Sequence, residues 1–83
     1  MKKILVNVFI PILGIGYDVF IPNDLKMGEV AALLKKAVVE LSDGQIVVSE
    51  ATAICMRNTG TILDINHTAY ELGIKNGSKL MII

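Results

Sequence analysis

The sequence predicts an α+β fold in which one main helix covers one face of a mixed sheet. Two alternating apolar segments separated by Pro and Gly open the chain, over residues 3–10 and 17–21. A helical apolar stripe follows over 27–41, and short alternating segments return after residue 52. With 83 residues, the chain has room for one hydrophobic core, so we expect a single domain spanning 1–83.

The first two segments are expected to pair as a β-hairpin. In 3–10, KILVNVFI, side chains alternate between two faces, and the predicted inner face carries Ile4, Val6, Val8 and Ile10. The segment YDVFI at 17–21 alternates in the same way, with Tyr17, Val19 and Ile21 opposite Asp18 and Phe20. The connection PILGIG contains Pro and two Gly residues, which predicts a turn of open type.

A helix is expected after Pro22. Asn23 or Asp24 could cap its first turn through a side-chain oxygen. Gly44 suits the left-handed position that ends many helices. The predicted buried stripe has helical spacing and consists of Met27, Val30, Leu34, Ala37 and Leu41.

The second half of the chain predicts short strands joined by an irregular crossing. Residues 45–51 fit either a strand or an apolar connector, 52–58 and 61–63 fit strands, and 64–74 has no sustained period. Leu72 and Ile74 are the expected anchors of this crossing, which fits an irregular segment or a single helical turn. The last strand, 78–83, is expected to point Leu80 and Ile82 inward and to pair in parallel with 3–10 at the centre of the sheet.

The ending ILDINHTAYELGIKNGSKLMII resembles that of ubiquitin-like β-grasp domains, whose apolar anchors match Leu63, Ile74, Leu80 and Ile82. The resemblance covers nearly the whole chain, although the hairpin loop and residues 42–51 depart from ubiquitin. Within the superfamily, LGIKNGSKLMII is most similar to the bacterial YukD/EsaB-type proteins that accompany type VII (ESX/WXG) secretion. This resemblance implies a ubiquitin-like β-grasp sheet of about four to five strands with one main helix. It also implies a non-catalytic protein-interaction module that is an accessory or regulatory component of such a system.

Composition argues against several function classes. Eight basic residues balance eight acidic ones without a basic cluster, so no nucleic-acid partner is expected. The lone Cys55 cannot form an internal disulfide, which fits a reducing compartment. With one Cys and one His, a zinc site is not expected, and no motif indicates another cofactor.

The chain is apolar for its length, with 53% hydrophobic residues and a mean hydropathy of +0.61. It has no run of about 18 uncharged apolar residues, so no membrane insertion is expected. The N-terminal MKKILVNVFIPILGIG resembles a signal peptide, but Asn7 and Pro11 interrupt it and no clear cleavage site follows. We therefore expect a cytoplasmic protein.

The sequence argues against conjugation or sulfur transfer at the chain end, and against catalysis by a thiol and a base. Ubiquitin-type conjugation and sulfur transfer need a terminal Gly-Gly, whereas this sequence ends in Leu80, Met81, Ile82 and Ile83. A tail-less relative of modifiers or sulfur carriers is the alternative. His67 and Cys55 could form a base and a thiol nucleophile, but no third orienting group is evident, so no catalytic residue is predicted.

The sheet face opposite the helix is the predicted partner surface. Alternation assigns to it an apolar group that includes Cys55 and is interrupted by charges, which is typical of interaction surfaces. Ubiquitin-like domains bind partners through this face, so the resemblance points the same way. The alternatives are a homodimer contact, a small structural homo-oligomer, or a face covered by residues 45–51 or by the hairpin loop. The predicted partner-binding residues are Leu5, Phe9, Phe20, Arg57, Lys79 and Met81.

Overall fold

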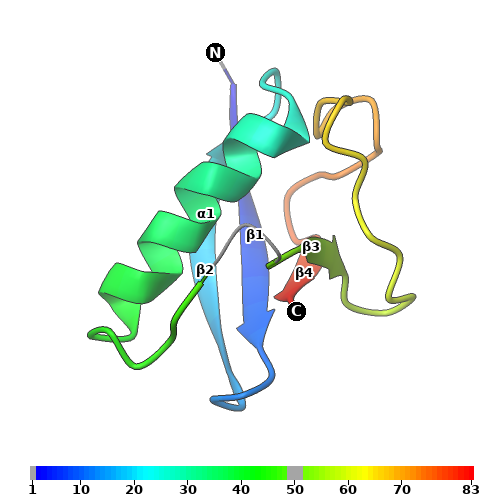
Figure 1. Cartoon of the computed structure of the whole chain (residues 1–83). Helices are drawn as coiled ribbons and strands as arrows, with labels where there is room; N and C mark the ends of the chain where they lie inside the picture. The colour runs from blue at the N-terminus through cyan, green and yellow to red at the C-terminus, as the bar shows by residue number, and fades with distance from the viewer. Residues whose placement is uncertain (1, 49–51) are drawn as a thin grey trace.

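The computed structural model describes residues 2–48 and 52–83. Its strands are β1 (Lys3–Ile10), β2 (Ile15–Pro22), β3 (Ile54–Met56) and β4 (Lys79–Ile82), and its helix is α1 (Met27–Leu41). The four strands form one sheet in the order β2-β1-β4-β3, and α1 crosses one face of it (Figure 1). The predicted α+β architecture is therefore confirmed.

The centre of the sheet is the parallel pair β1 and β4, as predicted. Val8 lies opposite Leu80 in this pair, and neither side chain is exposed to solvent. β2 pairs antiparallel with β1 on one side, and β3 pairs antiparallel with β4 on the other. The two middle strands thus carry much of the core, which explains why β1 is rich in β-branched residues.

β2 is longer than the sequence indicated, because it begins at Ile15 rather than Tyr17. Ile15 pairs with Ile10, so the turn is confined to 11–14, where Gly14 takes a φ of +68° and its N–H donates to the Ile10 carbonyl. Gly16 is a strand residue here. A Cβ at Gly16 would lie 2.9 Å from Oδ1 of Asn7, so its missing side chain makes room for a cross-strand neighbour.

The start of α1 is not capped as predicted. Lys26 occupies the N-cap position without a side-chain hydrogen bond, so the expected caps at Asn23 and Asp24 were wrong. Instead, the N–H of Met27 donates to the His67 carbonyl at 2.8 Å, and the N–H of Gly28 donates to the Ile65 carbonyl at 3.0 Å. Backbone from the later crossing therefore satisfies the free amides of the first turn.

The buried stripe of α1 also differs in its second half. Met27, Val30 and Leu34 are buried as expected, but the stripe continues to Val38. Ala37 is only half-buried and Leu41 is 47% exposed, so their assignment to the core was wrong. Four-residue steps from Val30 keep the stripe on the sheet, since residues four apart lie on the same face of a helix. Gly44 follows with a φ of +77°, which confirms the predicted left-handed ending.

The connections after α1 contain less regular structure than expected. Residues 45–48 form no strand, and the remainder of the ambiguous segment, 49–51, lies outside the described residues. The predicted strand at 61–63 is an isolated bridge between Ile62 and Cys55. The predicted strand at 52–58 shortens to Ile54–Met56, and the last strand begins at Lys79.

The crossing over 64–74 is irregular and contains one helical turn, in agreement with the two forms expected for it. The side chain of Glu71 accepts from the Thr68 N–H at 2.9 Å, while the Thr68 hydroxyl accepts from the Glu71 N–H at 3.1 Å. This reciprocal arrangement is a capping box. The turn buries Ala69 and Ile74 in the core, whereas Leu72 is half-buried against it.

Candidate functional site on the outer face of the sheet

The residues predicted to bind a partner lie on the sheet face opposite α1, which we call the outer face. Their position follows from strand register, because directly opposed residues share a face. Leu5 pairs with Phe20 across β1 and β2, and Phe9 pairs with Met81 across β1 and β4. Lys79 lies opposite Asn7. Arg57 directly follows β3, and its N–H donates to the Lys79 carbonyl at 3.0 Å.

Exposure differs along the outer face. Phe20 is 67% exposed, which is unusual for a large aromatic side chain in a strand, and Leu5 is 37% exposed. Phe9 and Met81 are half-buried, whereas Arg57 and Lys79 are exposed. A partner would therefore gain most apolar contact at Phe20 and Leu5, while the charged groups lie near Phe9 and Met81.

A polar pair divides the apolar residues of the outer face into two groups. Nδ2 of Asn7 donates to Oδ1 of Asp18 at 3.1 Å across β1 and β2. Leu5 and Phe20 lie on one side of this pair, and Phe9 lies on the other, because Asn7 is midway between Leu5 and Phe9 on the same strand. The face is thus two apolar areas with a satisfied polar contact between them.

The Arg57 side chain is held against Phe9. Its guanidinium carbon lies 4.1 Å from the centroid of the Phe9 ring, a cation–π contact that joins the end of β3 to β1 across β4. The contact covers part of the Phe9 ring, in keeping with its half-buried state. It also fixes a positive charge over an apolar area.

Cys55 lies on the outer side of the sheet, as the alternation suggested, because it pairs with Met81. Its side chain is fully buried, and its backbone lies between Met81 of β4 and the bridging residue Ile62. Burial raises the pKa of the Cys55 thiol, because the thiolate would lose its hydration. Cys55 therefore points to the outer side of the sheet without offering a partner any exposed surface.

The shape of the molecule matches solved structures closely. The ubiquitin-like domain of EccD5 from Mycobacterium xenopi superimposes with a TM-score of 0.81 at 18% identity, covering 100% of this chain and 94% of the other. The ubiquitin-like domain of the Mycobacterium tuberculosis type VII secretion protein EccD1 gives 0.81 at 13% identity, covering 100% and 99%. The chain has a ubiquitin-like β-grasp fold.

A third solved structure with this fold lies within a larger assembly. A chain of the MycP5-free ESX-5 inner membrane complex gives a TM-score of 0.81 at 17% identity, covering 100% of this chain and 21% of the other. No family model matches the sequence, and a search of curated proteins finds no match. The similarity to these solved structures therefore establishes the fold alone.

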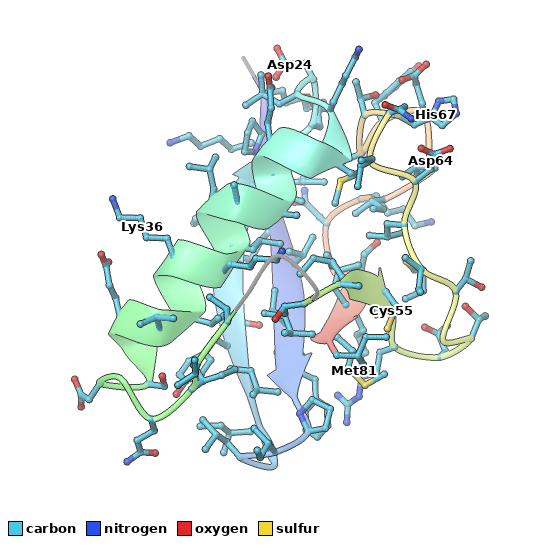
Figure 2. All side chains as sticks on the ribbon, viewed as in Figure 1. Asp24, Lys36, Cys55, Asp64, His67 and Met81 are labelled. Atoms are coloured by element: carbon cyan, nitrogen blue, oxygen red, sulfur yellow. The ribbon has the colours of Figure 1, made fainter. Side chains whose placement is uncertain are left out.

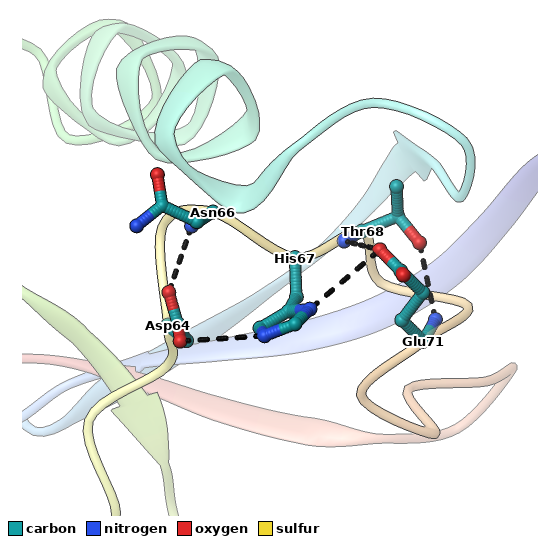
Figure 3. Close-up of polar contacts among 5 residues, drawn as sticks. All are labelled: Asp64, Asn66, His67, Thr68 and Glu71. Carbon is teal, nitrogen blue, oxygen red and sulfur yellow. Dashed lines mark hydrogen bonds and ion pairs between the residues drawn. The ribbon is translucent and has the colours of Figure 1, made fainter.

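His67 lies between two acidic side chains of the crossing over 64–74. Its Nε2 lies 3.5 Å from Oδ2 of Asp64, and its Nδ1 lies 3.8 Å from Oε1 of Glu71 (Figure 3). The Thr68 N–H, more than any other neighbour, holds the pKa of Glu71 below its ordinary value. His67 lies beside the start of α1, whereas Cys55 lies on the short strand next to Met81 (Figure 2). The structure does not bring the imidazole and the thiol together.

Within residues 2–48 and 52–83, no group of three or more His, Cys, Asp or Glu side chains could hold a metal ion. In the same part of the chain, no helix is long and apolar enough to cross a membrane.

Proposed function

We propose that this ubiquitin-like domain is a non-catalytic interaction module that binds a protein partner through its outer face. The observation that carries the proposal is the pair formed by Leu5 and Phe20, which are exposed side by side on neighbouring strands. A monomer gains nothing from keeping a phenyl ring 67% exposed in a regular strand, whereas a partner that covers the ring gains its burial.

We further propose that the partner belongs to a type VII-like secretion system, in which this protein has an accessory or regulatory role of the YukD/EsaB type in the bacterial cytoplasm. The terminal motif LGIKNGSKLMII and the shape shared with the EccD1 and EccD5 ubiquitin-like domains support this proposal. Genes for a secretion ATPase or a WXG-type substrate beside the gene for this protein would favour it. Their absence from the genomic neighbourhood would count strongly against it.

Direct binding tests the role of the outer face. The purified chain would be titrated by calorimetry against the soluble part of the secretion ATPase encoded nearby. We expect Phe20→Asp to weaken binding at least about tenfold, because an aromatic anchor at an interface commonly contributes more than 1 kcal/mol. The matched control is Tyr70→Asp, since Tyr70 is 77% exposed and lies in the crossing rather than on the sheet. Equal affinities of the wild type and Phe20→Asp would refute the outer face as the binding surface.

A further inference from the structure

A pocket of about 630 Å³ lies beside Arg57, whose guanidinium stacks on Phe9 of the outer face. It forms where the end of β3 lies beside the turn that precedes β4, and the bond from the Arg57 N–H to the Lys79 carbonyl joins its two sides. We call it the Arg57–Lys79 pocket. Its lining residues are Met56, Arg57, Asn58, Gly77, Ser78 and Lys79.

The charges of this pocket are all of one sign. Arg57 and Lys79 line it and are exposed, and no acidic residue is among its described lining residues. Nowhere in 2–48 and 52–83 does a carboxylate form an ion pair with either cation. Arg57 instead stacks on Phe9, which leaves the N–H groups around the edge of the planar guanidinium available to an acceptor.

We propose that the Arg57–Lys79 pocket binds a carboxylate from an acidic side chain of the partner protein. This inference rests on the proposed function, because it names the chemistry of the partner at the same face. The guanidinium is already fixed by the Phe9 ring, so less side-chain freedom is lost when the carboxylate binds. The apolar residues next to this acid would contact Phe9 and Met81.

Charge and surroundings favour a protein carboxylate over a nucleic-acid phosphate. The chain has no net charge, with eight basic and eight acidic residues. Nucleic-acid binding depends on many phosphate contacts spread over a basic surface. Here two cations adjoin half-buried Phe9 and Met81, an arrangement that suits a segment with acidic and apolar residues together.

The strand order sets the spacing of the partner's anchors. Phe20 lies on β2 and Arg57 at the end of β3, with β1 and β4 between them, so three inter-strand spacings of about 4.8 Å, or about 14 Å, separate the two positions. An extended partner segment would cover this length with about four residues. We therefore expect an aromatic or aliphatic residue at Leu5 and Phe20, and an acidic residue about four positions away at the Arg57–Lys79 pocket.

A pair of capped peptides tests the inference by NMR titration of the ¹⁵N-labelled chain. One peptide has the sequence Phe-Thr-Leu-Thr-Glu-Glu, and its uncharged counterpart has Gln in place of both Glu residues. We expect the acidic peptide to shift the amides of Phe9, Arg57 and Lys79, and to bind about tenfold more tightly than its counterpart, as charge-assisted hydrogen bonds do. Arg57→Gln should lose the same factor. Lys36→Gln, an exposed cation on α1, should lose none.

Equal binding of the two peptides would overturn the inference, as would unchanged binding by Arg57→Gln or an absence of shifts at several millimolar peptide. An oligothymidylate that shifts the same amides more strongly would assign the pocket to nucleic acid and also overturn it. If Phe20→Asp weakens the acidic peptide while Arg57→Gln does not, the outer face stands and only the carboxylate site fails. If Arg57→Gln alone weakens it, the carboxylate site stands without the anchor at Phe20.

Discussion

At the scale of single residues, Cys55 shows that the side of the sheet and the exposure of a side chain are separate properties. Alternation places Cys55 on the side of Met81, and the register agrees, yet its side chain is fully buried. A buried thiol with a raised pKa is a poor nucleophile, because the thiolate is the reactive form. Cys55 is therefore a core residue with respect to its packing.

We predict that Cys55 reacts slowly with a thiol reagent in the folded protein and rapidly in concentrated urea. Burial both raises the thiol pKa and excludes the reagent, so the folded rate should be at least about a hundredfold lower, as expected for reaction through opening. The release of thionitrobenzoate measures both rates. A cysteine introduced at exposed Ile12 provides the control and should react at similar rates in both conditions.

A second prediction concerns Glu71 and acid stability. Its pKa lies below the ordinary value of 4.5 in the folded chain, chiefly because its carboxylate accepts from the Thr68 N–H. A lowered folded pKa gives stability that is complete above the unfolded pKa and is lost as pH falls through the folded pKa. Glu71→Gln should therefore lower the urea midpoint at neutral pH and flatten its decline in acid.

The control for Glu71→Gln is Glu40→Gln near the C-terminal end of α1. The Glu40 side chain makes no hydrogen bond with the described residues. This variant should keep the pH profile of the wild type. A profile for Glu71→Gln that parallels the wild type down to about pH 3 would contradict the role assigned to the Thr68 amide.

At the scale of elements, the helix provides a direct test of which residues form its buried stripe. Val38 is fully buried, whereas Leu41 is 47% exposed. Val38→Ala should lower the free energy of unfolding by about 2 kcal/mol through lost apolar burial and the cavity left behind. Leu41→Ala should cost less than about 1 kcal/mol. Urea denaturation measures both, and a larger loss at Leu41 would contradict the observed stripe.

Elements with a regular period were predictable, and those fixed by distant contacts were not. The alternation of Ile4, Val6 and Val8 correctly indicated β1. The position of α1 was predicted, but its capping was missed, because its first amides are satisfied by the carbonyls of Ile65 and His67, which no local pattern reveals. The turn after Thr68 did carry a local signal, since Thr-x-x-Glu is the sequence of a capping box.

The candidate site was predictable in part for the same reason. Alternation placed Leu5, Phe9 and Phe20 on one face, and the register agrees with this placement. The stacking of Arg57 on Phe9 depends on the order of the strands and on the end of β3, neither of which has a periodic signal. The pocket beside Lys79 is likewise a product of tertiary structure.

At the scale of the whole molecule, the short strand β4 is essential for folding, because it lies between β1 and β3 in the sheet. Leu80 is fully buried and Ile82 is 5% exposed, and both neighbours of β4 lose a partner without it. Deleting residues 79–83 should therefore leave the chain unfolded. The lost burial and pairing should exceed the free energy of unfolding of a typical domain, about 5–15 kcal/mol. Loss of dispersed amide signals in an NMR spectrum would report this outcome.

An insertion elsewhere provides the control for this deletion. Two Gly residues added after Ile12, which is 83% exposed in the hairpin turn, should leave the chain folded at a cost of about 1 kcal/mol. A folded spectrum for the chain without 79–83 would show that the remaining strands form a stable sheet by themselves, contrary to the expectation.

The sheet order also has a consequence for the timing of synthesis. Of the four strands, β4 leaves the ribosome last, yet it fills the place between β1 and β3. Until then, the growing chain holds a hairpin and a helix whose apolar sides have no central strand between them. Chaperones that recognise exposed apolar segments should therefore engage this protein during translation and release it soon after β4 emerges.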